Sequence, residues 1–306
     1  MTQNPPLSML SVLWAAFLCF LFGANVVAIK IGLAGLGVFT SAGIRFALSA
    51  AAITVWAAAT GRPFKVLRPH RLQLMTVCII FTVQLSLFHL GISKTQASRG
   101  ALIANMQPFF VLLLAHCFIA GDAMTVRKTV GILLGFGGVA FLFLDKNGIA
   151  SQVQTGDFII LAAAFMWACN GVYTKRILDH FQPFQVVLYP MIFSSPVFFI
   201  EGLVWDGTMI GRLDIRVLGA MAYQSLVTAA FGFVAWNSLL KKYGAVGLHS
   251  FLFIMPIAGV LLGGLVLDEP ISSRVLAALA LIVAGILSIH FRQAGSTTAM
   301  PVGRNV

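Results

Sequence analysis

Long apolar stretches, separated by short polar segments, run along almost the whole chain. Each stretch is near the roughly 20 residues that an α-helix needs to cross the hydrocarbon core of a bilayer. We therefore predict an all-α, polytopic membrane protein with ten transmembrane helices. The expected spans are 9–29, 38–59, 72–92, 99–119, 128–145, 157–177, 184–204, 217–239, 246–267 and 275–292.

The second half of the chain repeats the polar landmarks of the first half. Asn25, for example, recurs 145 positions later as Asn170. Each repeat holds five expected spans, and an odd number of crossings places the second repeat in the opposite orientation. The pattern predicts two inverted five-helix repeats, 1–148 and 149–306, an arrangement found in many secondary transporters. We expect the tail from about residue 294, rich in Gly, Ser and Thr, to be disordered.

The composition agrees with a membrane protein, since 59% of the residues are hydrophobic and 9% are charged. A soluble protein of this size and composition would expose far larger apolar patches than the few hundred Å² tolerated in solution. The formal net charge is +11, but the basic residues lie in short loops, so we expect no nucleic-acid partner. Twelve basic residues fall on the side of the termini and seven on the opposite side. This bias predicts cytoplasmic N- and C-termini.

Several classes of chemistry lack their sequence signature. The four cysteines lie inside expected spans without C-x-x-C spacing or paired histidines, so we expect no disulfide and no metal site. The sequence has no G-x-x-x-x-G-K-[ST] loop for nucleotide phosphates, and neither a G-x-S-x-G nor an H-E-x-x-H motif. We therefore expect a protein that is not an enzyme and uses no cofactor.

Polar and aromatic side chains inside the expected spans are candidates for a substrate site, because a polar group in the membrane needs a partner helix or a wet cavity. Trp167, Asn170 and Thr174 follow helical spacing and share one face. The candidate substrate-binding residues are Asn25, Gln84, His89, Asn105, Phe110, Trp167, Asn170, Gln224, Trp236, His249 and Phe253. The alternative is that the amides only join helices by hydrogen bonds, and that His89 is an ordinary hydrogen-bonded helix residue.

Proline, glycine and one arginine mark further special positions. Pro108 recurs 148 positions later as Pro256, and Gly137 matches Gly285 at the same offset. A proline inside a helix removes a hydrogen bond and crowds the preceding turn, so both prolines are candidate hinges, with a static kink as the alternative. Arg45 is the one basic residue well inside an expected span. It would either anchor a helix or meet an anionic group.

All nine acidic residues lie in loops or near the ends of expected spans. Proton-coupled carriers commonly use a carboxylate inside the membrane that alternates between a charged and a neutral form. The position of the acidic residues therefore favours facilitated or exchange transport, although a histidine could replace the carboxylate.

Several sequence stretches resemble a known family. They are Trp167-Ala168-Cys169-Asn170, its counterpart Phe22-Gly23-Ala24-Asn25, and Leu267-Asp268-Glu269-Pro270-Ile271 before the last expected span. With the ten spans and the duplication, they make residues 10 to 292 similar to the drug/metabolite transporter superfamily, and most of all to the EamA-type exporters of bacterial inner membranes. The first repeat departs from the pattern, because Gly121-Asp122 stands where the second has Asp268-Glu269.

The resemblance implies a ten-helix basket in the bacterial inner membrane, with cytoplasmic termini and a central cavity that opens alternately to each side. It implies a cargo of amino acids and related metabolites. Within the family, the chain is most similar to the exporters of aromatic and neutral amino acids. No oligomer is required for such a mechanism.

We therefore expect an alternating-access exporter of amino acids. The amide side chains would hold the polar backbone groups of the substrate, while Trp167, Phe110 and Phe253 would accept its side chain. One alternative is an exporter of another small metabolite or drug, with or without proton coupling. Another is a non-transporting membrane scaffold or receptor, which would lack accessibility that alternates between the two sides.

Overall fold

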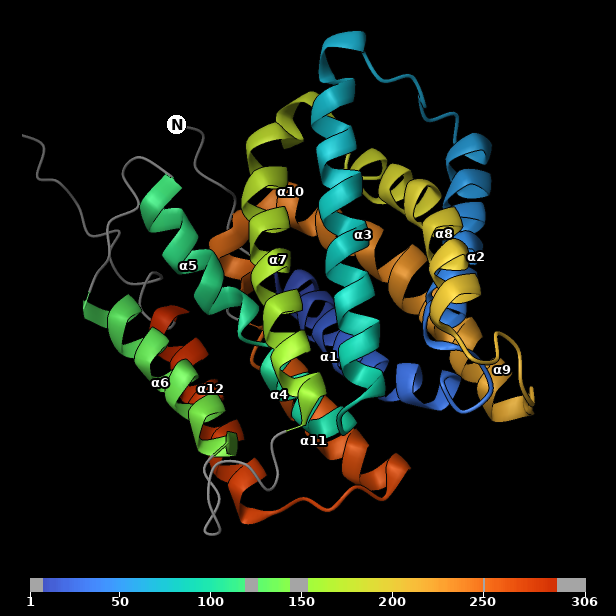
Figure 1. Cartoon of the computed structure of the whole chain (residues 1–306). Coiled ribbons are helices and arrows are strands. Elements are labelled where there is room, and N and C mark those ends of the chain that lie inside the picture. The colour runs from blue at the N-terminus through green and yellow to red at the C-terminus, as the bar shows by residue number, and fades with distance from the viewer. Residues whose placement is uncertain (1–7, 119–125, 144–153, 250, 291–306) are drawn as a thin grey trace, which may run out of the picture.

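The computed structural model describes residues 8–118, 126–143, 154–249 and 251–290 (Figure 1). These residues are almost entirely helical, which confirms the all-α prediction for this part of the chain. The α-helices are α1 (Met9–Gly32), α2 (Val38–Ala59), α3 (Arg71–Ser93), α4 (Ala97–Ala104), α5 (Gln107–Phe118), α6 (Val126–Phe143), α7 (Thr155–Ile177), α8 (Gln185–Trp205), α9 (Ile215–Ala222), α10 (Phe233–His249), α11 (Ile254–Leu267) and α12 (Ser273–His290). They are joined by the short helices η1 (Arg68–His70) and η2 (Leu178–His180) and by the wider helix η3 (Tyr223–Gly232).

Seven helical stretches of the described residues are long and apolar enough to cross a membrane, so the protein is a multi-pass membrane protein. They are Met9–Gly32, Val38–Ala59, Arg68–Ser93, Ala97–Leu114, Thr155–Ile177, Gln185–Trp205 and Ile215–Leu239. The three other expected spans fall on shorter apolar helices at Lys128–Phe141, Ile254–Leu267 and Ser273–Ser288. The full count of ten stays a prediction. The expected repeat boundary after residue 148 and the tail from about residue 294 lie outside the described residues.

The fourth expected span, 99–119, is two helices, which corrects the prediction of one continuous helix. The interruption is at Asn105 and Met106, between α4 and α5. The Asn105 side chain favours this break, because its Nδ2 donates to the carbonyl of Ala101 at 2.7 Å, the same acceptor that its own backbone N–H reaches at 3.3 Å. Pro108 then lies in the first turn of α5, where its missing N–H costs no helical hydrogen bond.

The ninth expected span, 246–267, is interrupted in a corresponding place. α10 continues to His249, α11 starts at Ile254, and Pro256 lies in the first turn of α11. The sequence analysis expected each proline inside a helix, as a hinge or a kink. In the structure neither Pro108 nor Pro256 lies in the middle of a helix. Each follows a break and lies where a helix tolerates proline.

The segments α9, η3 and α10 form one uninterrupted helical stretch from 215 to 249. Its middle part, η3, is a π-helix of ten residues, a conformation that often marks a functional site. This segment buries three polar side chains, those of Gln224, Ser225 and Thr228. The apolar pattern predicted a helix here and contained no sign of the wider winding.

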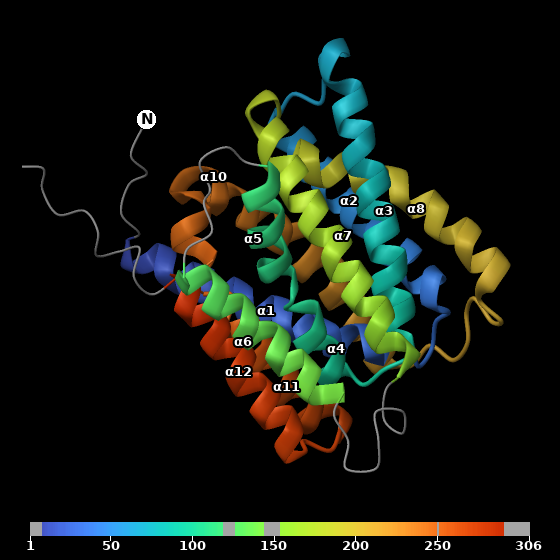
Figure 2. The same ribbon diagram turned by 60° about the vertical axis from the view of Figure 1, so that its left-hand side comes forward.

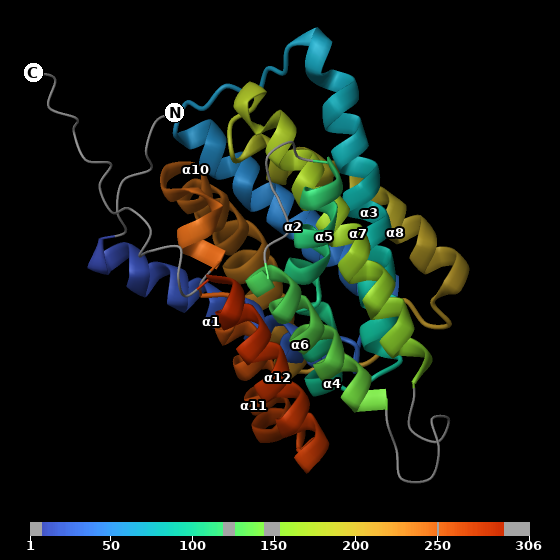
Figure 3. The same ribbon diagram turned by 90° about the vertical axis from the view of Figure 1, so that its left-hand side faces the viewer.

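The helices form a bundle in which two pairs occupy opposite flanks. In Figure 1, α6 and α12 lie on the left and α2 and α8 on the right, with α3 and α7 between them. Figure 2 brings the α6–α12 flank forward, and Figure 3 shows this flank facing the viewer with α8 far behind to the right. The interior of the bundle therefore lies between these flanks, where α1, α3, α7 and α11 pack together.

The flanking pair α2–α8 is antiparallel. Asp206, directly after α8, accepts hydrogen bonds from the backbone N–H groups of Phe39 and Thr40 at the start of α2, at 3.2 and 2.8 Å. At the other end of the pair, Trp56 of α2 packs edge-to-face on Phe184, directly before α8, with ring centroids 6.4 Å apart. The two helices thus cross the bundle in opposite directions.

The pairs α6–α12 and α3–α7 are antiparallel too. In the first pair, Gly131 lies beside Gly285 and Gly138 lies beside Ala278, so the start of one helix meets the end of the other. In the second pair, Gly91 near the end of α3 lies against Gly156 at the start of α7.

The outside of the bundle carries many exposed large apolar side chains. Val55 is 69% exposed, Leu203 71% and Leu265 77%. Such side chains are unfavourable in water but match the hydrocarbon of a bilayer. Helices can cross that hydrocarbon because they satisfy their own backbone hydrogen bonds. The opposite, inward faces bury large side chains completely, among them Phe46, Phe109 and Phe198.

Candidate functional site

Asn25 lies on α1 inside the bundle and is only 9% exposed. Its Oδ1 lies 2.8 Å from the hydroxyl oxygen of Thr228 on η3. The same hydroxyl lies 2.8 Å from the carbonyl of Gln224, so the amide of Asn25 is part of a network that joins α1 to η3. At this position the predicted site residue is a packed, interhelical hydrogen-bonding group.

Asn170, the sequence counterpart of Asn25, has different surroundings. It is partly exposed on α7, and its one hydrogen bond among the described residues is within its own helix, from Thr174 at 3.4 Å. At the offset of 148, the residue that matches Thr228 is Ile80, which has no hydroxyl to offer. The Asn170 amide is therefore the less occupied of the two.

Two aromatic pairs join the halves of the chain crosswise. Trp167 of α7 packs edge-to-face on Phe88 of α3, with ring centroids 5.8 Å apart and planes at 75°. Phe22 of α1 packs on Trp236 of α10 in the same way, at 6.0 Å and 77°. Phe22 matches Trp167 in the repeat and Phe88 matches Trp236, so the two contacts are counterparts of each other. Trp167 is thus the counterpart of Phe22 and Trp236 the counterpart of Phe88, and each tryptophan packs on a phenylalanine of the other repeat.

Phe110 and Trp167 do not lie on the same side of α7. It packs edge-to-face on Phe165 of α7 at 5.5 Å and on Phe136 of α6 at 5.4 Å. Phe165 precedes Trp167 by two residues, which is about 200° around an α-helix. Trp167 and Phe110, which we expected to accept the side chain of the substrate together, therefore lie on two different sides of α7.

Phe253 and His249 flank the break before α11. Phe253 directly precedes α11 and packs, partly buried, against the core. His249 is the last residue of α10, and its side chain lies outside the described part of the structure. Asn105, at the corresponding break between α4 and α5, uses its amide to bind the Ala101 carbonyl.

Three further predicted residues are fully buried and keep one polar atom without a partner among the described residues. The atoms are Oε1 of Gln84, Nε2 of His89 and Oε1 of Gln224. Their other ends are bonded where the structure describes them: His89 Nδ1 lies 3.0 Å from the Leu85 carbonyl, and Gln224 Nε2 donates to the Ala28 carbonyl at 3.1 Å. Buried polar atoms are nearly always bonded, so these atoms indicate an unmet binding capacity inside the bundle.

One end of the bundle is held by an acidic residue that the sequence analysis classed only as near a span end. Asp157, in the first turn of α7, is fully buried. It accepts a hydrogen bond from the Thr95 hydroxyl at 2.6 Å and forms an ion pair with Arg99 at 2.5 Å. These contacts tie the α3–α4 connection to α7.

Glu269 holds the same connection from the other side. Its carboxylate accepts hydrogen bonds from the backbone N–H groups of Ala97 and Ser98, at 2.6 and 2.8 Å, and so caps the N-terminus of α4. The sequence signal was the Asp268-Glu269 turn, which was assigned no role. Its counterpart in the first repeat, Gly121-Asp122, lies outside the described residues.

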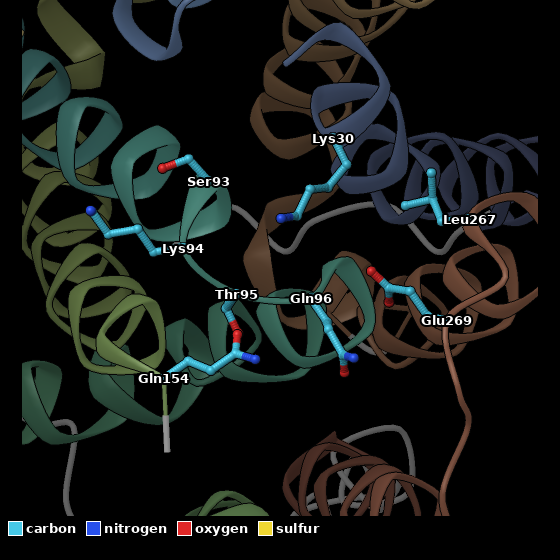
Figure 4. A pocket seen from close by; sticks show the side chains of 8 residues that line it. All are labelled: Lys30, Ser93, Lys94, Thr95, Gln96, Gln154, Leu267 and Glu269. Atoms are coloured by element: carbon cyan, nitrogen blue, oxygen red, sulfur yellow. The ribbon is translucent and has the colours of Figure 1, made fainter. Parts of the chain in front are cut away.

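A cavity of about 550 Å³ opens at this end of the bundle (Figure 4). In Figure 4, Lys30 and Glu269 approach it from one side and Ser93, Lys94 and Gln154 from the other. A second cavity, of about 590 Å³, lies at the opposite end of α3 and is mainly apolar. It is lined by Phe64, Lys65, Val66, Arg71, Leu74, Met75, Cys78, Tyr189, Ile192 and Phe193. Neither lining contains any of the predicted site residues.

The interior offers mainly neutral binding groups, beside the buried guanidinium of Arg45. Among the described residues there is no group of three or more His, Cys, Asp or Glu side chains that could hold a metal ion. The interior instead presents amides, hydroxyls and aromatic rings, which hold small polar molecules by hydrogen bonds and apolar contact.

Comparisons with known proteins give the family context. A sequence model described as the EamA-like transporter family matches the chain twice, over residues 9–144 and 154–291. The chain is similar to a "Probable amino-acid metabolite efflux pump" of Escherichia coli strain K12, with 27% identity over 89% of this chain and 92% of the relative. It is also similar to a "Probable terminal-alkyne amino-acid exporter" of Streptantibioticus cattleyicolor, with 25% identity over 92% of this chain and 94% of the relative.

A solved crystal structure shares the fold. It superposes with a TM-score of 0.70 at 17% sequence identity, and the match covers 94% of this chain and all of the other chain. At this identity the likeness concerns the fold alone.

Proposed function

The chain belongs to the EamA-like transporter family, and we propose that it exports amino acids, aromatic and other neutral ones, by alternating access. It is a membrane transporter, and the proposal concerns its cargo, direction and mechanism. The observation that carries it is an amide beside an aromatic ring at matching points of both halves, Asn25 near Phe22 and Asn170 near Trp167. Amides bind zwitterions without a fixed charge, and rings offer apolar surface to side chains of varied size.

The named relatives support the cargo class. The Escherichia coli relative carries a name for amino-acid metabolite efflux and the Streptantibioticus relative a name for amino-acid export. Both align along most of the chain. The preference for aromatic and neutral amino acids is supported by the buried amides and by the rings of Trp167 and Trp236.

We place ten spans in two inverted five-helix repeats, 1–148 and 149–306. The helix contacts support this, because each has the partner expected when the halves exchange: α1 packs on η3 as α7 packs on α3, and α1 packs on α11 as α7 packs on α5. The pairs α2–α8 and α6–α12 are their own counterparts, and both run antiparallel. An odd number of crossings in each repeat requires this direction.

The hinges of alternating access are placed at the two helix breaks that precede Pro108 and Pro256. The breaks occur at equivalent points of the two repeats, between α4 and α5 and between α10 and α11. At a break fewer helical hydrogen bonds resist rotation, so α5 and α11 would move relative to the segments before them.

The substrate site is placed inside the bundle, with the two end cavities as its approaches. Its central members are Asn170 and Trp167, because they combine a weakly occupied amide with a ring on one face of α7. The other proposed lining residues are Gln84, His89, Asn105, Phe110, Gln224, Trp236, His249 and Phe253. Asn25 borders the site as part of the packed network with Thr228. In this arrangement Asp157 and Glu269 close one end of the pathway.

Facilitated or exchange transport is the proposed energetic mode. The buried carboxylate of Asp157 is already paired with Arg99. Glu201, near the end of α8, accepts a hydrogen bond from Ser86 at 2.9 Å. An imposed pH gradient should therefore change net accumulation little, whereas strong uphill uptake driven by that gradient would favour proton coupling instead.

The proposed location is the bacterial inner membrane with both termini in the cytoplasm. The excess of basic residues on the side of the termini supports this orientation, and the two named relatives are bacterial proteins.

Transport in proteoliposomes tests the function. The purified protein is reconstituted, and exchange of radiolabelled phenylalanine, leucine and other neutral amino acids is measured against empty vesicles. We expect saturable exchange, with the aromatic substrates competing best. No flux above empty vesicles for any aromatic or aliphatic amino acid would contradict the proposal.

A further inference from the structure

Arg45 is a buried cation without an anionic partner among the residues that the structure describes. It lies on α2 and is 2% exposed. Its Nε has no hydrogen-bond partner among the described residues. Burying a charge without a partner is costly, so an unpaired guanidinium inside the bundle needs a reason.

The surroundings of Arg45 are aromatic and polar. The guanidinium carbon lies 4.9 Å from the centre of the Phe46 ring, a cation–π contact that fixes the group but does not neutralise it. His89 packs on the same ring, with centroids 6.2 Å apart, and interacts electrostatically with Arg45. Its Nε2 is also without a partner among the described residues. Two side chains from two helices thus present unmet polar capacity around one ring.

Arg45 also faces the unusual part of the fold. One turn after it, the hydroxyl of Ser49 lies 2.6 Å from the Arg45 carbonyl and 2.8 Å from the carbonyl of Ser225 in η3. This contact holds the Arg45 turn of α2 against the π-helix. Arg45 therefore lies on a part of α2 that is packed against η3.

The second repeat has no equivalent cation. α8 is the counterpart of α2, and its sequence from Gln185 to Trp205 contains no lysine, arginine or histidine. If a basic residue anchored this helix in both repeats, α8 would contain one too. A positive charge present on one side only would orient a zwitterion in the site.

From these observations we infer that Arg45 binds the carboxylate of the exported amino acid. The planar guanidinium donates several N–H groups in a geometry that matches a carboxylate. The inference rests on the proposed function and specifies its cargo as molecules that carry a free carboxylate. The guanidinium acts as a binding group, and Phe46 holds it in place.

The test compares ligands that differ only at the carboxylate. Exchange of labelled phenylalanine is measured in proteoliposomes with unlabelled phenylalanine or phenylalanine amide as the competitor. A charge-assisted hydrogen bond contributes about 1.5–3 kcal/mol, so Arg45→Gln should raise the KM for phenylalanine about tenfold or more. Inhibition by the amide should stay unchanged. Arg45→Lys should fall between the wild type and Arg45→Gln, and it serves if Arg45→Gln does not fold.

Arg62→Gln is the matched control. Arg62 also stacks over an aromatic ring, with its guanidinium carbon 4.5 Å from the Trp56 ring, but it is exposed and lies just beyond α2. This variant should leave the KM for phenylalanine unchanged. Equal loss of phenylalanine and amide recognition in the Arg45 variants would overturn the inference and make Arg45 a structural anchor.

Failure of the proposed function is distinguished by ligand-induced thermal stabilisation in detergent. If the wild type exchanges no amino acid, its melting temperature is measured with benzoate and with benzamide. Stabilisation by benzoate alone, lost in the Arg45 variants, would keep Arg45 as a carboxylate-binding group in a transporter of other acids. No difference between the two ligands would overturn the inference.

Discussion

Asn25 and Asn170 occupy matching positions in the two repeats, yet they do different work in the fold. Asn25 is nearly buried and lies 2.8 Å from the Thr228 hydroxyl on a neighbouring helix. Asn170 is partly exposed and is bonded only within its own helix among the described residues. A repeated residue therefore does not imply a repeated role, because the partner helix determines which amide stays available to a ligand.

Gly137 and Gly285 show the same divergence in packing. A Cβ at Gly285 would lie 2.8 Å from the Gly131 carbonyl oxygen and 3.1 Å from the Gly135 backbone nitrogen. A Cβ at Gly137 would meet nothing within 4 Å. One glycine therefore permits close contact between α6 and α12, while its counterpart faces open space.

The largest expected effect separates these two glycines. Gly285→Leu should destabilise the protein by about 1–3 kcal/mol or more, because the nearest atoms belong to a helix backbone and cannot move alone. Gly137→Leu should change stability by about 0.5 kcal/mol or less. Size-exclusion chromatography and thermal melting of both variants measure this. Equal stability of the two variants would show that the two glycines do not differ in packing.

Asn170→Ala and Trp167→Ala should reduce transport while the protein still inserts and folds. Loss of one hydrogen bond to a charged substrate group costs about 1.5 kcal/mol, so exchange at low substrate concentration should fall about tenfold for Asn170→Ala. The measurement is proteoliposome exchange, normalised to folded protein. If both variants instead lose folded protein, these residues belong to the packing of the bundle.

Asn25→Ala should act mainly on stability. Hydrogen bonds between membrane helices contribute about 0.6 kcal/mol on average, which sets the expected loss. Thr228 keeps the Gln224 carbonyl as a partner in this variant, so its hydroxyl is not left unsatisfied. Chemical or thermal denaturation of Asn25→Ala beside Asn170→Ala checks the difference. A larger transport defect for Asn25→Ala than for Asn170→Ala would reverse the assignment.

The last comparison concerns the crosswise aromatic pairs. Double-mutant cycles on Phe88 with Trp167 and on Phe22 with Trp236 should give couplings of about 0.5–1.5 kcal/mol each. Because the ring geometries agree closely, with centroids 5.8 and 6.0 Å apart, the two couplings should agree with each other. A strong coupling in one pair and none in the other would show that the repeats are not energetically equivalent there.

The sequence alone predicted the helical class and the positions of the apolar spans, because apolar length is a local property. It also identified Asn25, Asn170, Trp167 and Trp236 as special, because repetition along the chain needs no knowledge of contacts. The contact between Asn25 and Thr228 could not be predicted, since it joins residues 203 positions apart. The position that matches Thr228 holds Ile80, which has no hydroxyl, and Asn170 is bonded within its own helix instead, to Thr174.

Other features depended on local competition between hydrogen bonds. Proline positions predicted irregular helices, but the break at Asn105 arises because its side chain binds the Ala101 carbonyl. The π-helix from Tyr223 to Gly232 has an ordinary apolar helix pattern. Trp167 and Phe110 lie on two sides of α7 because of the rings that they contact. Trp167 packs on Phe88 of the neighbouring α3, whereas Phe110 packs on Phe165 of α7 itself.

Two-sided cysteine labelling tests alternating access most directly. Cys19, Cys78, Cys117 and Cys169 are replaced by alanine, and a single cysteine is introduced as Asn170→Cys or, for comparison, Asn25→Cys. Vesicles of both orientations are then treated with a membrane-impermeant maleimide. We predict that Asn170→Cys reacts from both sides and is protected by substrate, while Asn25→Cys reacts little. Reaction of Asn170→Cys from one side only, unaffected by substrate, would contradict this prediction.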